Sequence, residues 1–302
     1  MGNIFAERIE ALRNMMADNG WDAVVITGSD PHSSEYPAPR WKQVEWLTGF
    51  TGEAGDVVVT ADHAGLWTDS RYFIQALDQL EGTGVELHKT RVPGAVPIPQ
   101  WLSDKARVVA VDGLCQSVSA VKELEEGLGE GGLVVDVPDM LQELWHDRPQ
   151  IPVTPVTTLD VECFGGIPRF EKISWLRKWM LVQGYDKVLL SSLDEVVWML
   201  NVRGSDIEYN PLVISYLLVS QDYVKWFVKK SVVDSELDPD TLDSFDELRM
   251  DGVDVEDYDA VFFALSDFGE DADSGVIFID PSTLNANVYK YISGCFPAVS
   301  VV

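Results

Sequence analysis

A helix-then-strand unit occurs twice in this chain, and the repeat constrains the fold more than any other feature. Residues 7–30 read ERIEALRNMMADNGWDAVVITGSD, residues 171–194 read EKISWLRKWMLVQGYDKVLLSSLD, and the two align without a gap. In both copies, apolar residues at helical spacing end at a glycine that can close the helix, and a short apolar strand follows. The repeat predicts two domains of one fold. Identical residues recur as Glu7 and Glu171, Ile9 and Ile173, Leu12 and Leu176, Arg13 and Arg177, Met16 and Met180, Gly20 and Gly184, Asp22 and Asp186, Val24 and Val188, and Asp30 and Asp194.

A proline-spaced segment separates the two copies. Pro149, Pro152, Pro155 and the pair Gly165-Gly166 interrupt both helical and strand patterns. Such a segment continues neither a helix nor a central strand, so it is expected to be an extended linker. A length of 302 residues also suits two domains. We therefore predict a first domain over 1–155 and a second over 156–302.

The first domain is predicted to alternate strands with helices. A helix carrying Leu124 and Leu128 on one face begins at a cap supplied by Ser117 or Ser119. Two further helices are expected, one over Gln43–Leu47 and one that opens at Asp69. The predicted strands are 23–27, 57–60, 65–68, 108–111 and 133–135.

The second domain shows the same alternation. Helices are predicted over 169–183 and 194–201, and a hairpin pairs 212–219 with 223–228 through a turn at Gln221-Asp222. Strands near 260–265 and over 188–191 and 276–279 complete the sheet. Because helices and strands interleave in both halves, each is predicted to be an α/β domain with a mixed sheet flanked by helices.

Composition excludes several classes of function. The net charge of −28 repels nucleic acid and anionic membranes, so no partner of either kind is expected. No run of about 18 apolar residues and no signal-peptide pattern is found, and the three cysteines lack CxxC spacing, which together suit a reducing cytoplasm. The acid is spread along the chain, which favours a solvated surface over a platform for a basic partner such as a histone.

No motif for catalysis is present. His32, His63, His88 and His146 lack the spacing of a metal-ligand set, and no GxSxG elbow occurs. We therefore expect neither a catalytic residue nor a metal ligand in this chain. Gly49, Gly52 and Gly55 follow a predicted helix, so they are expected to permit a tight turn with positive φ rather than to bind phosphate. The tryptophans that could stack a ligand are interpreted instead as core or contact anchors: Trp41, Trp46, Trp67 and Trp198.

Three stretches of the first domain and one of the second carry a family resemblance. The first three are DPHSSEY at 30–36, TGFTGEAG at 48–55 and WTDSRYFIQA at 67–76. They resemble the amino-terminal domain of the Xaa-Pro aminopeptidases (aminopeptidase P), in the larger family that includes creatinase and prolidase. LDEVVWMLNVRGSD at 193–206, followed by Tyr209-Asn210-Pro211, is similar to the second domain of the long, three-domain form of these enzymes.

The resemblance implies a fold and a parent activity. The fold is two tandem creatinase N-terminal-like domains with a ribonuclease-H-like motif. The parent enzyme removes an amino-terminal residue that precedes proline, so its partner is a peptide with proline at the second position. It uses two divalent metal ions, with manganese expected, held in a carboxy-terminal pita-bread domain that this chain does not reach. We therefore expect an inactive amino-terminal region that contributes substrate access and dimer contacts to a cytoplasmic homodimer.

The resemblance also suggests substrate-binding residues. The arginine of its WTDxRY motif, which is Arg71 here, contacts the bound peptide, and the loop with His32, Glu35 and Tyr36 would lie at the mouth of the active site. A guanidinium suits a peptide carbonyl or carboxylate because its donors form a planar fork. The alternatives are a salt bridge from Arg71 to Asp69 or Glu53, and a loop that packs only on itself.

Two other functions are compatible with the sequence. One is a stand-alone creatinase-like binding module for basic proteins or peptides, as in the large subunit of the FACT histone chaperone. The other is a fragment of another hydrolase of the creatinase family, such as prolidase. The stretches WTDSRYF and DPHSSEY argue against the first, and the repeated domain with Asn201-Val-Arg-Gly204 argues against the second.

Overall fold

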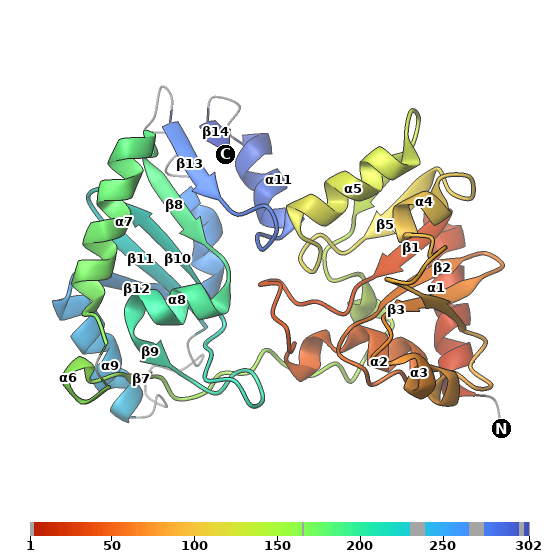
Figure 1. Ribbon diagram of the computed structural model, residues 1–302, viewed down its shortest axis with the longest axis horizontal. Helices are drawn as coiled ribbons and strands as arrows, with labels where there is room; N and C mark the ends of the chain where they lie inside the picture. Colours follow the sequence, from red (N-terminus) through yellow and green to blue (C-terminus); the bar gives the residue numbers. More distant parts are fainter. Residues whose placement is uncertain (1–2, 165, 230–238, 266–274, 296–298, 302) are drawn as a thin grey trace. The chain divides into compact units, whose positions relative to one another are not determined.

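The computed structural model describes residues 3–164, 166–229, 239–265, 275–295 and 299–301 (Figure 1). The chain forms two compact units, named here unit one (1–150 with 285–287) and unit two (151–284 with 288–302). Both are α/β, with helices on a mixed sheet.

The sheet of unit one has six strands in the order β4-β3-β2-β1-β5-β6. β1 runs antiparallel to β2 and parallel to β5, β2 is antiparallel to β3, and the outer pairs β3–β4 and β5–β6 are parallel. The strands are β1 (Ala23–Ile26), β2 (Asp56–Thr60), β3 (Ala64–Thr68), β4 (Glu86–Lys89), β5 (Val108–Val111) and β6 (Leu133–Asp136). The helices are α1 (Ile4–Asn19), α2 (Gln43–Thr48), α3 (Phe73–Gln79), α4 (Ile98–Leu102) and α5 (Val118–Leu128), with short 3-10 turns at Pro39–Trp41 and Met140–Glu143.

Unit two repeats this topology in its sheet β12-β11-β10-β8-β13-β14. β8 is antiparallel to β10 and parallel to β13, β10 is antiparallel to β11, and β11–β12 and β13–β14 are parallel. The prediction that both halves share one strand order is confirmed. The strands are β8 (Lys187–Leu190), β10 (Ser215–Ser220), β11 (Val224–Val228), β12 (Val253–Asp257), β13 (Gly275–Ile279) and β14 (Val299–Val301), with β7 (Thr157–Thr158) and β9 (Val202–Arg203) as a separate pair. The helices are α6 (Val161–Phe164), α7 (Arg169–Gln183), α8 (Leu193–Leu200), α9 (Pro239–Met250) and α11 (Ala286–Cys295).

The repeated aspartate links the first strand of each unit to the strand that pairs with it in parallel. Asp22 lies just before β1, and its carboxylate accepts a hydrogen bond from the backbone N–H of Val108 at 2.9 Å. Asp186 lies just before β8 and accepts from the N–H of Val276 at 2.8 Å. In both units the carboxylate therefore fixes the start of the strand that runs parallel to the first one.

The repeated arginine links each long helix to the far end of a strand. Arg13 of α1 donates from Nε to the carbonyl of Thr60 at 3.0 Å, and Arg177 of α7 donates from Nε to the carbonyl of Ser220 at 2.8 Å. Both acceptors are the last residue of the second strand of their unit. Arginine recurs at this position because it makes the same hydrogen bond in both units.

A third equivalence extends the repeat beyond the aligned segments. Arg8 stacks over the ring of Trp46 at 4.5 Å and donates to the Trp46 carbonyl near the end of α2. Lys172, at the matching position of α7, lies 4.4 Å over the ring of Trp198 and donates to its carbonyl near the end of α8. A cation at the carboxyl end of a helix is favourable because free carbonyls there carry partial negative charge. The two units therefore share side-chain chemistry as well as topology.

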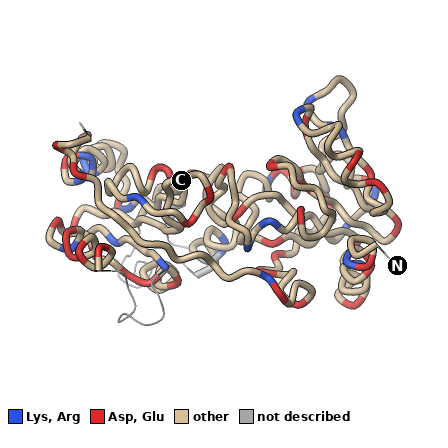
Figure 2. The backbone as a smooth tube through the Cα atoms, turned by 90° about the horizontal axis from the view of Figure 1, so that it is seen from below, with Lys and Arg blue, Asp and Glu red and all other residues tan. Residues whose placement is uncertain are grey.

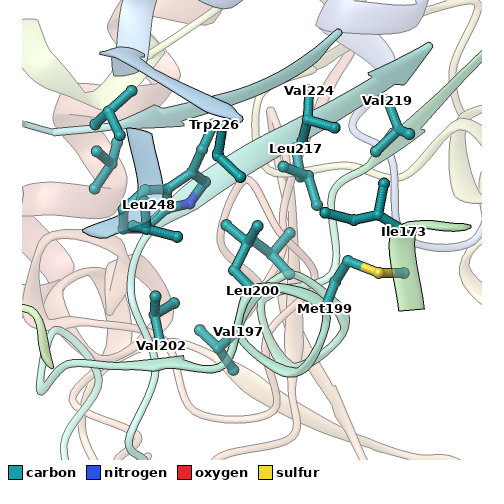
Figure 3. Close-up of a cluster of buried hydrophobic side chains, with 14 of the residues drawn as sticks. Ile173, Val197, Met199, Leu200, Val202, Leu217, Val219, Val224, Trp226 and Leu248 are labelled. Atoms are coloured by element: carbon teal, nitrogen blue, oxygen red, sulfur yellow. The ribbon is translucent and has the colours of Figure 1, made fainter. Parts of the chain in front are cut away.

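The cores lie on the two faces of each sheet. Val57, Val58 and Val59 of β2 are completely buried, and Val188 and Leu189 of β8 are each 1% exposed. The predicted strands over 57–60 and 188–191 are thus buried strands in the interior of their sheets. Figure 3 shows one cluster of unit two, in which side chains of α7 and α8 meet those of the sheet around Trp226.

The predicted strand near 260–265 is wrong. That segment is helical, and the strand lies earlier, at β12 (Val253–Asp257), which pairs in parallel with β11. Within β12, Val253 and Val255 point inward while Asp254 is exposed. The alternation of valine with acid is the pattern of a half-buried strand, and the surrounding acidic residues obscured it.

Candidate functional site

The residues predicted to contact substrate come from two segments at one end of the first sheet. Residues 30–36 follow β1, and residues 69–72 follow β3. β1 and β3 are both antiparallel to β2, so they run in the same direction and their carboxyl ends meet at the same edge. Helix α3 begins at Phe73 rather than at Asp69 as predicted. Asp69 instead forms a turn in which its side chain accepts from the backbone N–H of Arg71 at 3.1 Å, a local bond that competes with a helix.

Arg71 and Asp69 form a fork-to-fork ion pair. Nε of Arg71 lies 3.0 Å from Oδ1 and Nη2 lies 2.8 Å from Oδ2 of Asp69. The guanidinium holds the pKa of Asp69 down at about 2, and the carboxylate raises the pKa of Arg71. The predicted alternative, a salt bridge to Asp69, is therefore present. The arginine is nevertheless open to solvent, because its side chain is 59% exposed while that of Asp69 is only 10% exposed.

Glu35 and Tyr36 lie in the electrostatic neighbourhood of Arg71. The carboxylate of Glu35, followed by that of Glu53, raises the pKa of Tyr36. Glu35 also contributes, after Asp69 and Tyr72, to the raised pKa of Arg71. Glu35 is exposed and Tyr36 is half-buried. The structure thus brings three of the four predicted residues to one accessible surface.

His32 does not share that surface. It is 1% exposed, and its backbone N–H donates to Oδ1 of Asp30 at 2.9 Å. The same oxygen accepts from the N–H of Ser34, also at 2.9 Å. Asp30 is itself 1% exposed, so this end of the loop is folded around a buried carboxylate. The sequence placed His32 beside Glu35 and Tyr36, but the turn at Asp30 directs them to different environments.

The glycine-rich loop supports the ring next to Arg71. Phe50 is fully buried and meets Tyr72 edge-on at 5.8 Å and 89°. A Cβ on Gly52 would lie 2.2 Å from Cζ of Phe50, and one on Gly55 would lie 3.1 Å from its Cε1. Of the three glycines Gly49, Gly52 and Gly55, only Gly49 has a positive φ, of 79°. The prediction of positive φ is thus wrong for Gly52 and Gly55, where the absent side chain makes room for Phe50.

Further hydrogen bonds fix this loop to α3. Oγ1 of Thr51 accepts from Nε2 of Gln75 at 2.9 Å and from Nε2 of Gln79 at 2.8 Å, and the N–H of Thr51 donates to Gln79. The hydroxyl of Tyr72 donates to Glu53 at 3.4 Å. Side chains held from several directions keep a defined geometry, which is what a recognition surface requires.

A metal-ligand group was not predicted from the sequence. Among the described residues, His63, Glu86 and His88 form a single group of three such side chains whose ligand atoms all lie within 4.8 Å of one another. The signal that could have found it is the ExH spacing of Glu86 and His88, but their strand β4 was not among the predicted strands. Two imidazoles and one exposed carboxylate suit one ion, not a dinuclear site that needs bridging carboxylates. The group therefore does not fit the paired ions that the resemblance implies.

The tryptophans divide into two kinds. Trp41 and Trp67 are 4% and 3% exposed, as expected of core anchors. Trp46 and Trp198 each line an open hollow of their own unit, of about 700 and 510 Å³. Trp198 is 52% exposed. Trp46 and Trp198 are thus equivalent, and each is partly accessible beside the cation that stacks on it, Arg8 or Lys172.

Acidic residues are spread along both units. Figure 2 shows Asp and Glu along both units, with Lys and Arg interspersed. No helix among the described residues is long and apolar enough to cross a membrane. Cys115 is buried and Cys163 is exposed, and both are free thiols.

Two family models match the chain, and each covers one of the two units. The model of the creatinase/prolidase N-terminal domain matches residues 8–144, and a second model of the same description matches residues 147–300. The chain belongs to the creatinase/prolidase N-terminal domain family. It consists of two such domains in tandem, so the resemblance noted in the sequence is confirmed.

Relatives within this family are peptidases. The chain is 31% identical to aminopeptidase P2 of Arabidopsis thaliana over 96% of its own length and 41% of the relative. It is 32% identical to Xaa-Pro aminopeptidase 1 of Dictyostelium discoideum over 97% of its length and 47% of the relative. X-prolyl aminopeptidase from Caenorhabditis elegans, described as a cytosolic enzyme with a di-nuclear active site, superposes with a TM-score of 0.86 and 29% identity, covering 98% of this chain and 49% of that one. The chain thus spans less than half of each.

Proposed function

We propose that this chain is the amino-terminal region of an Xaa-Pro aminopeptidase. The observation that carries the proposal is the match of both units, over almost the whole chain, to Xaa-Pro aminopeptidases. The complete protein would remove the residue that precedes proline, in the cytoplasm, with two divalent metal ions, manganese being our proposed metal. The one ligand group among the described residues does not fit a dinuclear site, and the proposal therefore assigns those ions to residues outside this chain.

Within that enzyme, unit one would bind the peptide through Arg71. Its Nη1 makes no hydrogen bond with the described residues, whereas Nε and Nη2 are oriented by Asp69. A guanidinium fixed by one carboxylate keeps donors for a second acceptor, such as a peptide carbonyl or carboxylate. Glu35 and Tyr36, in the same neighbourhood, would add an acceptor for a peptide amine and a flat contact surface. Substrate access through this surface is the role we propose for the unit.

The test is Arg71→Ala in the complete enzyme, assayed with Arg-Pro-Pro. Loss of a charge-assisted hydrogen bond should lower kcat/KM on the order of 10- to 150-fold, and Arg71→Lys should recover only part because an ammonium lacks the fork. Arg91→Ala is the matched control, since Arg91 is exposed and also acts on Asp69 but is not paired with it. Unchanged kcat/KM in Arg71→Ala, with a lowered melting temperature, would show that the residue only stabilises the turn.

We also propose that α7 supplies a homodimer contact. Monomeric proteins seldom expose contiguous large apolar side chains, and such a patch commonly marks an interface. Of the five equivalent positions of α1, four hold alanine or aspartate and one holds methionine, so the fold does not require large apolar residues at most of them. Two chains of charge −28 repel one another, so their association would have to come from buried apolar surface. The exposed large apolar residues of α7 are Phe170 (62%), Trp175 (48%), Trp179 (38%), Leu181 (67%) and Val182 (80%).

Light scattering after gel filtration tests the dimer. The 302-residue chain should have twice its mass of 33.6 kDa, and Trp175→Glu should return it to the single-chain mass. Ile74→Glu is the matched control, because Ile74 is an 87% exposed apolar residue on α3 of unit one. A single-chain mass for the unaltered protein at 100 µM would contradict the proposal.

A further inference from the structure

Three side chains on one face of the first sheet converge beside its outermost pair of strands. Glu86 and His88 are two apart in β4, so both point to the same face. His63 lies in the turn before β3, two residues ahead of Gly65, whose register partner is Glu86. His88 in turn is the partner of Trp67. Parallel pairing of β3 with β4 thus places all three ligating groups on one face.

Gly65 is what allows the two imidazoles to meet. A Cβ at this position would lie 2.8 Å from Nε2 of His63 and 2.7 Å from Cδ2 of His88, closer than real side chains approach. Without that side chain, the Nε2 atoms of the two histidines approach to 3.0 Å. The nearest oxygen of Glu86 completes the group, with all ligand atoms within 4.8 Å of one another.

Neighbouring rings hold the histidines in place. Trp67 stacks on His88 with ring centroids 3.8 Å apart and an interplanar angle of 10°. Trp101 lies 5.0 Å from His63. Both histidines are half-buried and Glu86 is exposed, so an ion can reach the group from solvent.

The separation of the two nitrogens matches a shared ion. With metal–nitrogen bonds of about 2.0–2.1 Å, nitrogens 3.0 Å apart subtend about 90–97° at the metal. That angle is near the right angle of tetragonal Cu²⁺ and Ni²⁺ sites, and a small side-chain rotation would open it toward the tetrahedral angle of Zn²⁺. Imidazole is a preferred ligand of all three ions, and the carboxylate offsets part of their charge.

We propose that His63, Glu86 and His88 bind one divalent transition-metal ion of the imidazole-preferring class, Ni²⁺, Cu²⁺ or Zn²⁺. The site belongs to unit one and goes beyond the proposed peptidase role. Water would fill the remaining coordination positions, since three ligands converge among the residues that the structure describes. The competing arrangement is a metal-free hydrogen bond between two neutral imidazoles inside the aromatic cluster.

Calorimetric titration with NiCl₂ tests the site, using the 302-residue chain without a polyhistidine tag. Ni²⁺ is the first probe because it does not oxidise thiols, and Cys163→Ser removes the exposed cysteine as a competing ligand. One equivalent should bind. His63→Gln and His88→Gln should each weaken binding by at least about tenfold, because even groups that only support a ligand typically contribute 10–100-fold. His146→Gln, at an exposed histidine, is the matched control and should bind as the parent does.

Electron paramagnetic resonance of the unaltered chain with one equivalent of Cu²⁺ gives a second measurement that needs no variant. Two imidazole nitrogens should split the copper signal. Quenching of tryptophan fluorescence should accompany binding, because Trp67 stacks on a ligand. Absence of binding at 100 µM Ni²⁺, equal affinity in the His63→Gln/His88→Gln double variant, or a copper signal without nitrogen splitting would each overturn the proposal in favour of the metal-free pair.

Discussion

Gly52→Ala should destabilise unit one through a single added carbon. The new Cβ would lie 2.2 Å from Cζ of Phe50 and 2.8 Å from Cδ1 of Tyr72. Carbon atoms in van der Waals contact are about 3.5–4.0 Å apart, so one ring would have to move by more than about 1 Å. Phe50 is fully buried, and even a Cβ at Gly55 would lie only 3.1 Å from its Cε1, so the ring has little room to move.

The expected cost follows from overpacking in a filled core. Such insertions typically cost about 1–3 kcal/mol, and the short approach at Gly52 places this one near the upper value. For a unit of this size, a loss of about 3 kcal/mol corresponds to a melting temperature lower by about 6–12 °C. Differential scanning calorimetry and urea unfolding followed by tryptophan fluorescence would measure it. Displacement of Tyr72 should also move Arg71, so peptide binding by the complete enzyme should weaken in parallel.

Two further variants separate the clash from other effects of removing a glycine. Gly166→Ala, whose Cβ would meet nothing closer than 3.9 Å, should be neutral or slightly stabilising. Phe50→Leu introduced with Gly52→Ala should recover part of the loss, because the smaller side chain vacates the contested space. The reasoning would be refuted by a Gly52→Ala chain as stable as the parent within about 0.5 kcal/mol, a range typical of uninvolved surface positions.

The remaining predictions concern activity and pH. The 302-residue chain alone should not hydrolyse Arg-Pro-Pro with manganese present, and chelator-sensitive turnover would contradict this. Burial lowers the pKa of Lys172 to about 8, whereas an unfolded lysine titrates near about 10.4, so the unfolded chain binds more protons in between. Unit two should therefore gain stability from about pH 8 to 10 in urea unfolding, and Lys172→Met should abolish that slope. The pair with Arg71 holds the pKa of Asp69 at about 2, so its stabilisation should be complete above about pH 4 and lost toward pH 2. Thermal melts of Asp69→Asn should lack that dependence.

Elements with strong local signals were predictable from the sequence. Helix α7 spans Arg169–Gln183 as predicted, because apolar periodicity ends at Gly184, which adopts φ of 79°. Ser117 caps α5 by accepting from the N–H of Ala120, as one of the two proposed caps. The salt bridge of Arg71 with Asp69 could also be proposed, as the alternative to peptide contact, because the two residues are only two apart in the sequence.

Features that depend on partners distant in sequence were missed. β4 has half-exposed or exposed residues throughout, so nothing in its composition marked it as a strand. The approach of His63 to His88 depends on the register of β4 with β3, which no local pattern encodes. The burial of His32 likewise follows from the turn around Asp30 rather than from its own neighbours in sequence.

The acidic residues of β12 bear on whether the protein aggregates at high concentration. β12 ends the described order of the second sheet, and Asp254 and Asp257 on it are exposed. An outermost strand offers unpaired backbone groups to any other extended chain, and charged side chains discourage that addition. Neutral residues at these two positions would leave the melting temperature nearly unchanged yet favour strand-to-strand aggregation. Part of this chain's negative charge would thus serve to keep the protein from aggregating. A screen of variants by melting temperature alone would not detect the loss of that protection.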